Sequence, residues 1–389
     1  MKMKFYLLFF TLFIWIQEKH VFTLPRDEVL WALPQTDEQV EDLQNLLNTT
    51  EVILWQPVVV ENIKKDQEVH FYVRASNINS TKAQLRQLAI QHKVLIGDVQ
   101  GFIEKQTVND TVNPRRSSSY YENYHSMKEI YYWMEEVVNV HSDLLQKIYI
   151  GSSYEKRPLY VLKAIHVRER DPTMTMLLEH FDFYVMPVMN VDGYEYTWSH
   201  PSNRLWRKSR SKHGNSKCIG TDMNRNFDAH WCGRGASPYE CQETYCGPYP
   251  ESEPEVKAVA RFVRDHKSTI KAYITMHSYS QLVLFPYSYT TNRSKDHDEL
   301  DSLAKKAVKA IRRTTKETYR PGPGAQTIYL APGGSDDWAY DLGIKYSFTF
   351  ELRDTGTYGF LLPSQEIKPT CLEALSAVKE IAKHVLQHL

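Results

Sequence analysis

The feature that most restricts the fold is an alternation of helical and apolar strand patterns that begins at Tyr120. Strands are predicted at 146–151, 159–163, 183–188, 271–277, 281–286 and 346–352. Helices are predicted from 126 to about 140, at 173–180, after 252–255, at 296–315 and after 370–373. This order predicts an α/β domain, which we place at residues 117–389.

A second, self-contained pattern covers residues 23 to about 105. Two capping boxes, Thr36 with Gln39 and Thr81 with Gln84, each predict the start of a helix. Strands are predicted at 27–32, 52–55, 69–73 and 93–96. The resulting order, βαββαβ, predicts a small α+β open sandwich.

A polar segment, 106–119, separates the two patterns and contains Arg115 and Arg116. Its composition predicts an exposed linker. A trypsin-like protease could cut after either arginine, and a plain interdomain tether is the alternative. We therefore place the N-terminal domain at residues 24–116.

The first residues predict a secretory signal peptide at 1–23. Lys2 and Lys4 precede an apolar run, 5–16, that is too short to cross a bilayer. No later segment is apolar enough for a membrane helix, and 47 basic residues balance 47 acidic ones, so neither a membrane nor a nucleic acid is an expected partner. Four sequons support a glycosylated, extracellular protein: Asn48, Asn79, Asn109 and Asn292.

Four of the five cysteines lie within residues 218–246, which favours local disulfides in an oxidising compartment. A zinc cluster is the alternative, but the spacing contains no Cys-x-x-Cys pair. Cys371 is left over, and we expect a buried free thiol there.

Several fragments carry side chains suited to metal or acid–base chemistry. His166 and Glu169 are three residues apart and are both possible zinc donors, although this pattern alone arises by chance. His277 and Glu351 each end a predicted apolar strand, where side chains can project into a crevice at the sheet edge. For His277 alone, a core histidine is the simpler interpretation.

Two loop fragments, 203–207 and 222–226, add arginines and amides. Taken one at a time, each arginine is more simply a solvated surface residue. Taken in order, however, the fragments resemble the secreted zinc procarboxypeptidases of the A/B family, from the signal to Leu389. The motifs that carry the resemblance are Ile165-His-Val-Arg-Glu169, Arg204-Leu-Trp-Arg-Lys208, Asn224-Arg-Asn226, Met276-His-Ser-Tyr279, Ala331-Pro-Gly-Gly-Ser-Asp-Asp-Trp338 and Phe350-Glu-Leu-Arg-Asp-Thr-Gly356.

The resemblance implies a mixed, mostly parallel sheet flanked by helices and preceded by an activation segment that covers the cleft. It implies one Zn²⁺ per chain, held by His166, Glu169 and His277, which is the two-His, one-Glu set of carboxypeptidase A. Glu351 matches the family's general base and Arg207 the group that stabilises the developing oxyanion. Asn224, Arg225 and Tyr329 match the groups that hold the substrate's terminal carboxylate. Accessory positions in the cleft are matched by Arg168, Arg204, Tyr279 and Phe360.

Asp336 matches the floor of the pocket for the C-terminal side chain, where a carboxylate favours Lys or Arg. The alternative is a helix-capping role before Trp338, for which Asp337 is equally suited. The family also suggests two disulfides, Cys218–Cys241 and Cys232–Cys246. Activation would follow cleavage after Arg115 or Arg116 by a protease of the thrombin or plasmin type.

The chain departs from the family between Lys163 and Asp182, where it is too short. The family has a further strand leading into the His-x-x-Glu turn, a longer helix after it, and another disulfide. Two functions remain open. One is a secreted zymogen of a carboxypeptidase that removes C-terminal Lys or Arg in plasma and regulates fibrinolysis. The other is a catalytically impaired splice variant or truncated gene model that acts only as a binding glycoprotein.

Overall fold

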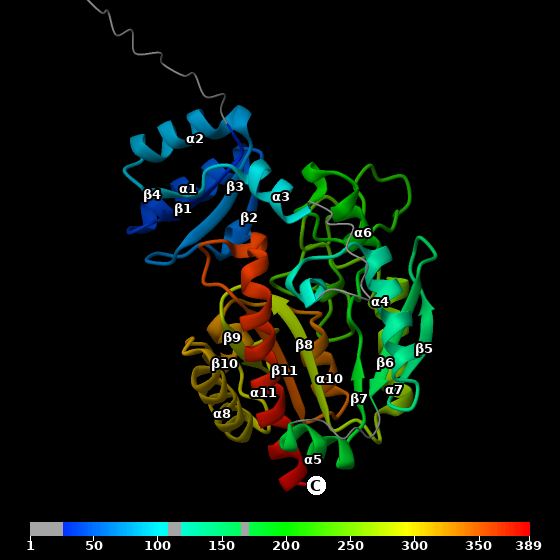
Figure 1. The fold of residues 1–389 in the computed structure, drawn as a ribbon. Coiled ribbons are helices and arrows are strands. Elements are labelled where there is room, and N and C mark those ends of the chain that lie inside the picture. Colours follow the sequence, from blue (N-terminus) through cyan, green and yellow to red (C-terminus); the bar gives the residue numbers. More distant parts are fainter. Residues whose placement is uncertain (1–25, 108–117, 165–170) are drawn as a thin grey trace, which may run out of the picture.

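The computed structural model describes residues 26–107, 118–164 and 171–389 (Figure 1). The signal peptide at 1–23, the sequon at Asn109 and the cleavage site at Arg115 and Arg116 lie outside the described residues. Within those ranges, no helix is long and apolar enough to cross a membrane.

The N-terminal unit is an antiparallel sheet covered by two helices, in the predicted βαββαβ order. Its strands pair in the order β2-β3-β1-β4. They are β1 (Glu28–Leu33), β2 (Val52–Gln56), β3 (Val69–Val73) and β4 (Gln91–Ile96). The helices, α1 (Asp37–Thr49) and α2 (Ala75–Gln87), bury their apolar faces in one cluster with the sheet.

The first capping prediction is confirmed in part: the Thr36 side chain accepts a hydrogen bond from the Gln39 backbone, but the Gln39 side chain accepts the backbone N–H of Gln35 rather than that of Thr36. The second is wrong: α2 begins at Ala75, and Thr81 lies inside it with its hydroxyl donating to the Asn77 carbonyl. The backbone N–H of Ala75 donates instead to the side chain of Asp27, which lies far away in the sequence. A further helix, α3 (Val99–Thr107), was not predicted.

The second domain begins with α4 (Met127–Val140), whose predicted capping box between Ser126 and Glu129 is present. A three-stranded antiparallel sheet follows, in the order β5-β6-β7. Its strands are β5 (Leu145–Ser152), β6 (Pro158–Ala164) and β7 (Phe183–Val185), so β7 is shorter than predicted. Helix α5 (Pro172–His180) lies between β6 and β7, and α6 (Val191–Ser199) follows β7.

The other sheet of this domain is mixed, in the order β10-β9-β11-β8. The pairs β8/β11 and β9/β10 are parallel, and β9/β11 is antiparallel. The strands are β8 (Ala272–Ser278), β9 (Leu282–Phe285), β10 (Arg320–Pro323) and β11 (Tyr346–Leu352).

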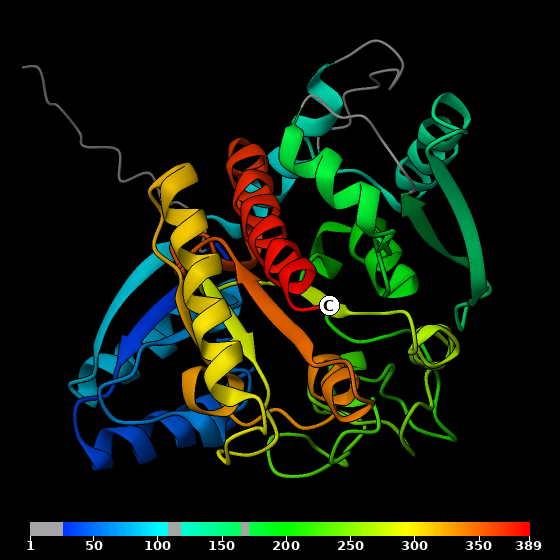
Figure 2. The same cartoon turned by 90° about the horizontal axis from the view of Figure 1, so that it is seen from below.

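Helices flank this sheet, as predicted. Figure 2 shows α8 (His297–Thr315) and α11 (Ile367–Gln387) side by side, and both contribute to the largest apolar cluster with β9 and β11. Helix α11 begins three residues before the predicted start at Thr370. The remaining helices are α7 (Pro254–His266), α9 (Gly324–Thr327) and α10 (Ser335–Asp341).

The two sheets of the second domain are separate, whereas a single sheet was expected. Within the described part of the chain, β7 pairs only with β6, and β8 pairs only with β11. Val185 and Met276 on these two strands are 52% and 45% exposed. We expected the chain to lack a strand near residues 163–182, and the separation of the two sheets is compatible with that expectation.

Both expected disulfides are present, Cys218–Cys241 and Cys232–Cys246. Cys371 is free, as predicted, but it is exposed rather than buried. It lies in the first turns of α11, on the side turned away from the core cluster. The sequon asparagines Asn48, Asn79 and Asn292 are all exposed, which is compatible with glycosylation.

Candidate active site

Parallel pairing of β8 and β11 places His277 and Glu351 directly opposite each other at the carboxyl end of the mixed sheet. In Figure 1 this end of β8 points toward the N-terminal unit. A cleft opens here, and seven of the predicted site residues line it: Arg207, Asn224, His277, Tyr279, Tyr329, Glu351 and Phe360. Residues more than 150 positions apart in the sequence are therefore brought to one place.

Burial and the nearby Arg207 determine the charge states of His277 and Glu351. Burial raises the pKa of Glu351 to about 8, and the guanidinium of Arg207 partly opposes this shift. Burial and the positive charge of Arg207 lower the pKa of His277 to about 4. His277 is therefore a neutral imidazole at pH 7, which is the form that binds a metal.

A carboxylate holds Arg207 in place. Its Nε and Nη2 donate to Oδ2 of Asp222 at 3.0 and 2.8 Å. Oδ1 of the same Asp222 accepts the backbone N–H of Asn224 at 3.1 Å, so one carboxylate connects both loops. Asp222 was not among the predicted site residues, although it begins the 222–226 fragment; its role depends on a contact between two loops.

Arg225 lies behind the cleft and is almost fully buried. Its Nε donates to the Gly235 carbonyl and its Nη1 to the Asn224 carbonyl, at 3.1 and 2.8 Å. Nη2 is buried and has no hydrogen-bond partner among the described residues. A buried guanidinium with a free N–H is well suited to an anionic group that is not part of the protein.

The two adjacent aspartates on α10 have different surroundings. Oδ2 of Asp337 accepts the backbone N–H groups of Ser288 and Tyr289 at 2.7 and 3.0 Å, which is a structural role. Oδ2 of Asp336 is buried and unpartnered within the described ranges. Neither residue is the N-cap, which is Gly334, so the helix-capping alternative is wrong for both.

The N-terminal unit packs directly on the cleft. The Trp55 ring meets Phe360 and Tyr279 edge-on, with centroid distances of 5.4 and 6.4 Å. Nδ1 of His70 lies 2.9 Å from the Tyr279 hydroxyl. The side chain of Gln106, on α3, donates to two backbone carbonyls just after Phe360.

Arg204 does not join the cleft residues. Its Nη2 donates to Gln106 at 3.3 Å, and burial lowers its pKa. His166, Arg168 and Glu169 lie outside the described residues.

Of the predicted zinc ligands, the described residues therefore contain His277 alone, and they include no group of three or more His, Cys, Asp or Glu arranged around one point. His277 itself fits a metal, because it is neutral and lies half-buried at the edge of the sheet, where it lines the cleft.

The fold and the site together define a zinc carboxypeptidase preceded by an activation peptide. The family model for zinc carboxypeptidases matches residues 164–377, and the model for carboxypeptidase activation peptides matches residues 30–106. The chain belongs to the zinc carboxypeptidase family.

Among its relatives are the carboxypeptidases B2. The rat protein is 56% identical over 423 aligned residues, which cover 99% of this chain and 100% of the relative. The human protein is 54% identical over an alignment that covers 96% of this chain and 96% of the relative. The crystal structure of thrombin activatable fibrinolysis inhibitor has a TM-score of 0.90 at 51% identity, covering 94% of this chain and 100% of that one.

The alignment with the rat protein also shows that this chain is shorter. Its 423 positions exceed the 389 residues of the chain by 34, so at least 34 positions have no residue here. The sequence predicts such a shortening between Lys163 and Asp182.

Proposed function

We propose that this chain is the secreted zymogen of a zinc carboxypeptidase that removes C-terminal Lys or Arg from peptides and proteins. The observation that carries the proposal is the buried, unpartnered carboxylate oxygen of Asp336. A substrate guanidinium or ammonium would satisfy it, whereas an apolar side chain would leave it unpaired.

The terminal carboxylate of the substrate is the natural partner for Arg225, whose free Nη2 is also buried. Asn224 and Tyr329 line the same cleft and add donors for that carboxylate. Asp336 and Arg225 would therefore recognise the two charges of a C-terminal basic residue. This requirement for a chain end makes the enzyme an exopeptidase.

Zinc would be held by His277 together with His166 and Glu169. A zinc ion at such a site would polarise the substrate carbonyl. It would also lower the pKa of water, so that the water loses a proton more easily and becomes a better nucleophile. Glu351, opposite His277, would accept a proton from water once a cation bound beside it lowers its raised pKa and leaves it ionised, and it would then return the proton to the leaving amine. Arg207, held by Asp222, would stabilise negative charge on the carbonyl oxygen. Tyr279 and Phe360, and after activation Arg168 and Arg204, would line the rest of the cleft.

The N-terminal unit would act as the activation segment. A trypsin-like protease that cuts after Arg115 or Arg116 would free the unit that places Trp55 over the cleft. The relative with the similar structure is known as thrombin activatable fibrinolysis inhibitor, and this likeness supports activation by a thrombin-type protease and a role in fibrinolysis in plasma.

The divided sheet favours the second candidate function, an impaired variant that only binds peptides or partners. A strand inside a sheet contributes a hydrogen-bonded ladder on each side, and its loss is large relative to the stability of a domain. The two candidate functions predict different zinc contents and different turnover after trypsin treatment. Bound zinc with release of C-terminal arginine supports the carboxypeptidase, and a metal-free chain without turnover supports the binding protein.

A further inference from the structure

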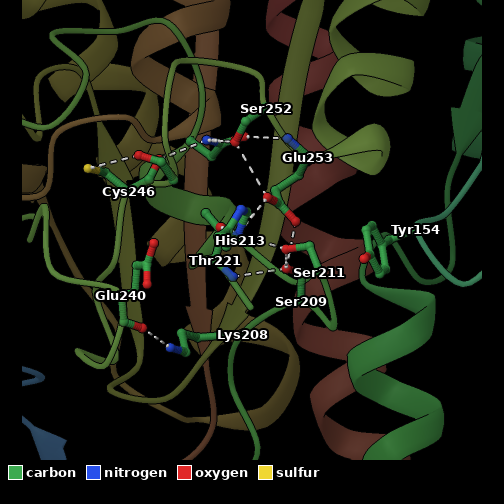
Figure 3. Close-up of polar contacts among 12 residues, drawn as sticks. Tyr154, Lys208, Ser209, Ser211, His213, Thr221, Glu240, Cys246, Ser252 and Glu253 are labelled. Atoms are coloured by element: carbon green, nitrogen blue, oxygen red, sulfur yellow. Dashed lines mark hydrogen bonds and ion pairs between the residues drawn. The ribbon is translucent and has the colours of Figure 1, made fainter. Parts of the chain in front are cut away.

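A buried polar network lies beneath the two loops that carry Arg207 and Asn224 (Figure 3). Its centre is Glu253, the N-cap residue of α7, whose side chain is 1% exposed. Ser209 lies two residues after Arg207, and Thr221 lies three residues before Asn224; both are fully buried. The network is thus close in sequence to the cleft residues without lining the cleft itself.

Ser209 connects both loops to Glu253. Its hydroxyl donates to Oε2 of Glu253 at 2.6 Å and accepts the backbone N–H of Thr221 at 2.9 Å. The backbone N–H of Ser209 in turn donates to the Thr221 carbonyl at 2.9 Å. The backbone and the hydroxyl of Ser209 thus both join the two loops, and the hydroxyl also attaches them to α7.

Asn226 makes a second connection from the other end of the Asn224 loop. Its Oδ1 accepts the backbone N–H of Glu253 at 3.1 Å, and its Nδ2 donates to the carbonyl of Cys246 at 2.7 Å. The loop that holds Asn224 and Arg225 is thus attached to residue 253 at both ends, through Thr221 and Ser209 at one end and through Asn226 at the other.

The remaining neighbours stabilise charge on Glu253. The hydroxyl of Ser252 donates to Oε1 at 3.4 Å, and Nε2 of His213 lies 3.6 Å from the same oxygen. His213 is itself held by Thr221, whose Oγ1 is 2.8 Å from Nε2. A buried carboxylate is costly, and here the hydroxyls of Ser209 and Ser252 and the nearby imidazole of His213 offset that cost.

We propose that Glu253 is a positioning residue that holds Arg207 in register with Asn224 and Arg225. The inference rests on the function proposed above for those three residues. The Glu253 side chain would act through Ser209, whereas the link to Asn226 is made by the backbone N–H of residue 253 and stays in place when the side chain is replaced. Placement matters because an error of about 1 Å in a catalytic group can lower a rate by roughly 100-fold.

Amide hydrogen exchange of the intact chain tests the connection without any need for activity. The variants are Glu253→Ala and Ser209→Ala, with Glu255→Ala as a matched control. Glu255 is also fully buried in the first turn of α7, but its carboxylate accepts the backbone N–H of Tyr154 instead. We expect exchange in segments 207–213 and 221–226 to become about tenfold faster in the first two variants and to stay unchanged in the control. Equal exchange in all three variants would overturn the inference.

Kinetic measurements on trypsin-treated protein test whether this positioning affects catalysis. For a peptide ending in arginine, Glu253→Ala is expected to raise KM and lower kcat, with kcat/KM reduced by about 10- to 100-fold. Glu253→Gln retains an acceptor for Ser209 and should recover most of the loss. A purely structural role would lower the melting temperature and leave both constants unchanged, and that result would contradict positioning. If the wild-type chain lacks turnover, the proposed function fails, while hydrogen exchange still decides the role of Glu253.

Discussion

Trp55 of the N-terminal unit meets Phe360 of the second domain edge-on, with ring centroids 5.4 Å apart. The indole is 3% exposed and belongs to a cluster that also contains Tyr279 and Leu361. Apolar burial therefore joins the activation segment to the mouth of the cleft, and the same contact blocks access to it.

Replacing Trp55 with alanine should weaken this closure. Removal of a buried Trp costs on the order of 3 kcal/mol, which corresponds to roughly a 100-fold larger open population. We expect the uncleaved chain to gain activity on a small arginine-ended substrate and to be cut faster in the 106–119 segment. The control is Trp133→Ala on α4, whose indole contacts Tyr121 away from the cleft. Equal activity of the two variants would contradict the blocking role of Trp55.

The two aspartates of α10 offer a paired test of specificity. Asp336→Asn removes the carboxylate whose Oδ2 has no hydrogen-bond partner among the described residues, so kcat/KM for C-terminal Arg should fall by about 100-fold or more, while substrates ending in Phe change little. Asp337→Asn disturbs the contacts with Ser288 and Tyr289 and should lower the melting temperature. If both variants keep their preference for Arg, Asp336 is not the specificity residue.

Glu255 should make stability depend on pH. Burial raises the pKa of Glu255 from 4.5 to about 7, so between these values the folded state binds more protons than the unfolded state. The free energy of unfolding therefore falls as pH rises through this window, by up to about 3 kcal/mol. Glu255→Gln removes the ionisable carboxyl group and therefore this loss of stability at higher pH.

Urea unfolding of wild type and Glu255→Gln at pH 5 and pH 8 measures the effect. The variant should be more stable at pH 8, and the difference should shrink toward zero at pH 5. A difference that is independent of pH would show that Glu255 ionises normally in the folded protein.

Among the described residues, β7 and β8 each have one unpaired edge, and these edges should promote self-association. Val185 on β7 is 52% exposed, and an apolar strand edge is a template for pairing with another chain. Val185→Lys should reduce concentration-dependent association in sedimentation velocity. Val140→Lys, at the exposed end of α4, is the control and should have no effect. Wild-type protein that stays monomeric at high concentration would contradict this prediction.

Local sequence patterns predicted most elements, and they failed where distant residues act. The periods of 2 and 3.6 residues, which reflect burial of one face, located the longer helices and every described strand except β10, but the shorter helices α3, α6 and α9 were not predicted. The predicted start of α2 was wrong, since the N–H of its first residue is satisfied by Asp27, which lies just before β1. The exposure of Cys371 was missed for a similar reason: which side of α11 faces the core depends on where that helix packs.

The candidate site was predicted through the resemblance more than through the residues alone. His277 and Glu351 could be placed at strand ends, but only the register of β8 and β11 shows that they are opposite each other. Asp222 and Glu253 were missed because each acts on an arginine or a serine from another loop. Contacts of this kind leave no periodic signal in the sequence.

The most direct test of the account is zinc content measured together with turnover on purified, trypsin-treated protein. We predict one zinc per chain and release of C-terminal arginine, with both lost when His277 is replaced by Ala. A chain that folds cooperatively yet binds no zinc and releases no arginine would contradict the proposed carboxypeptidase activity.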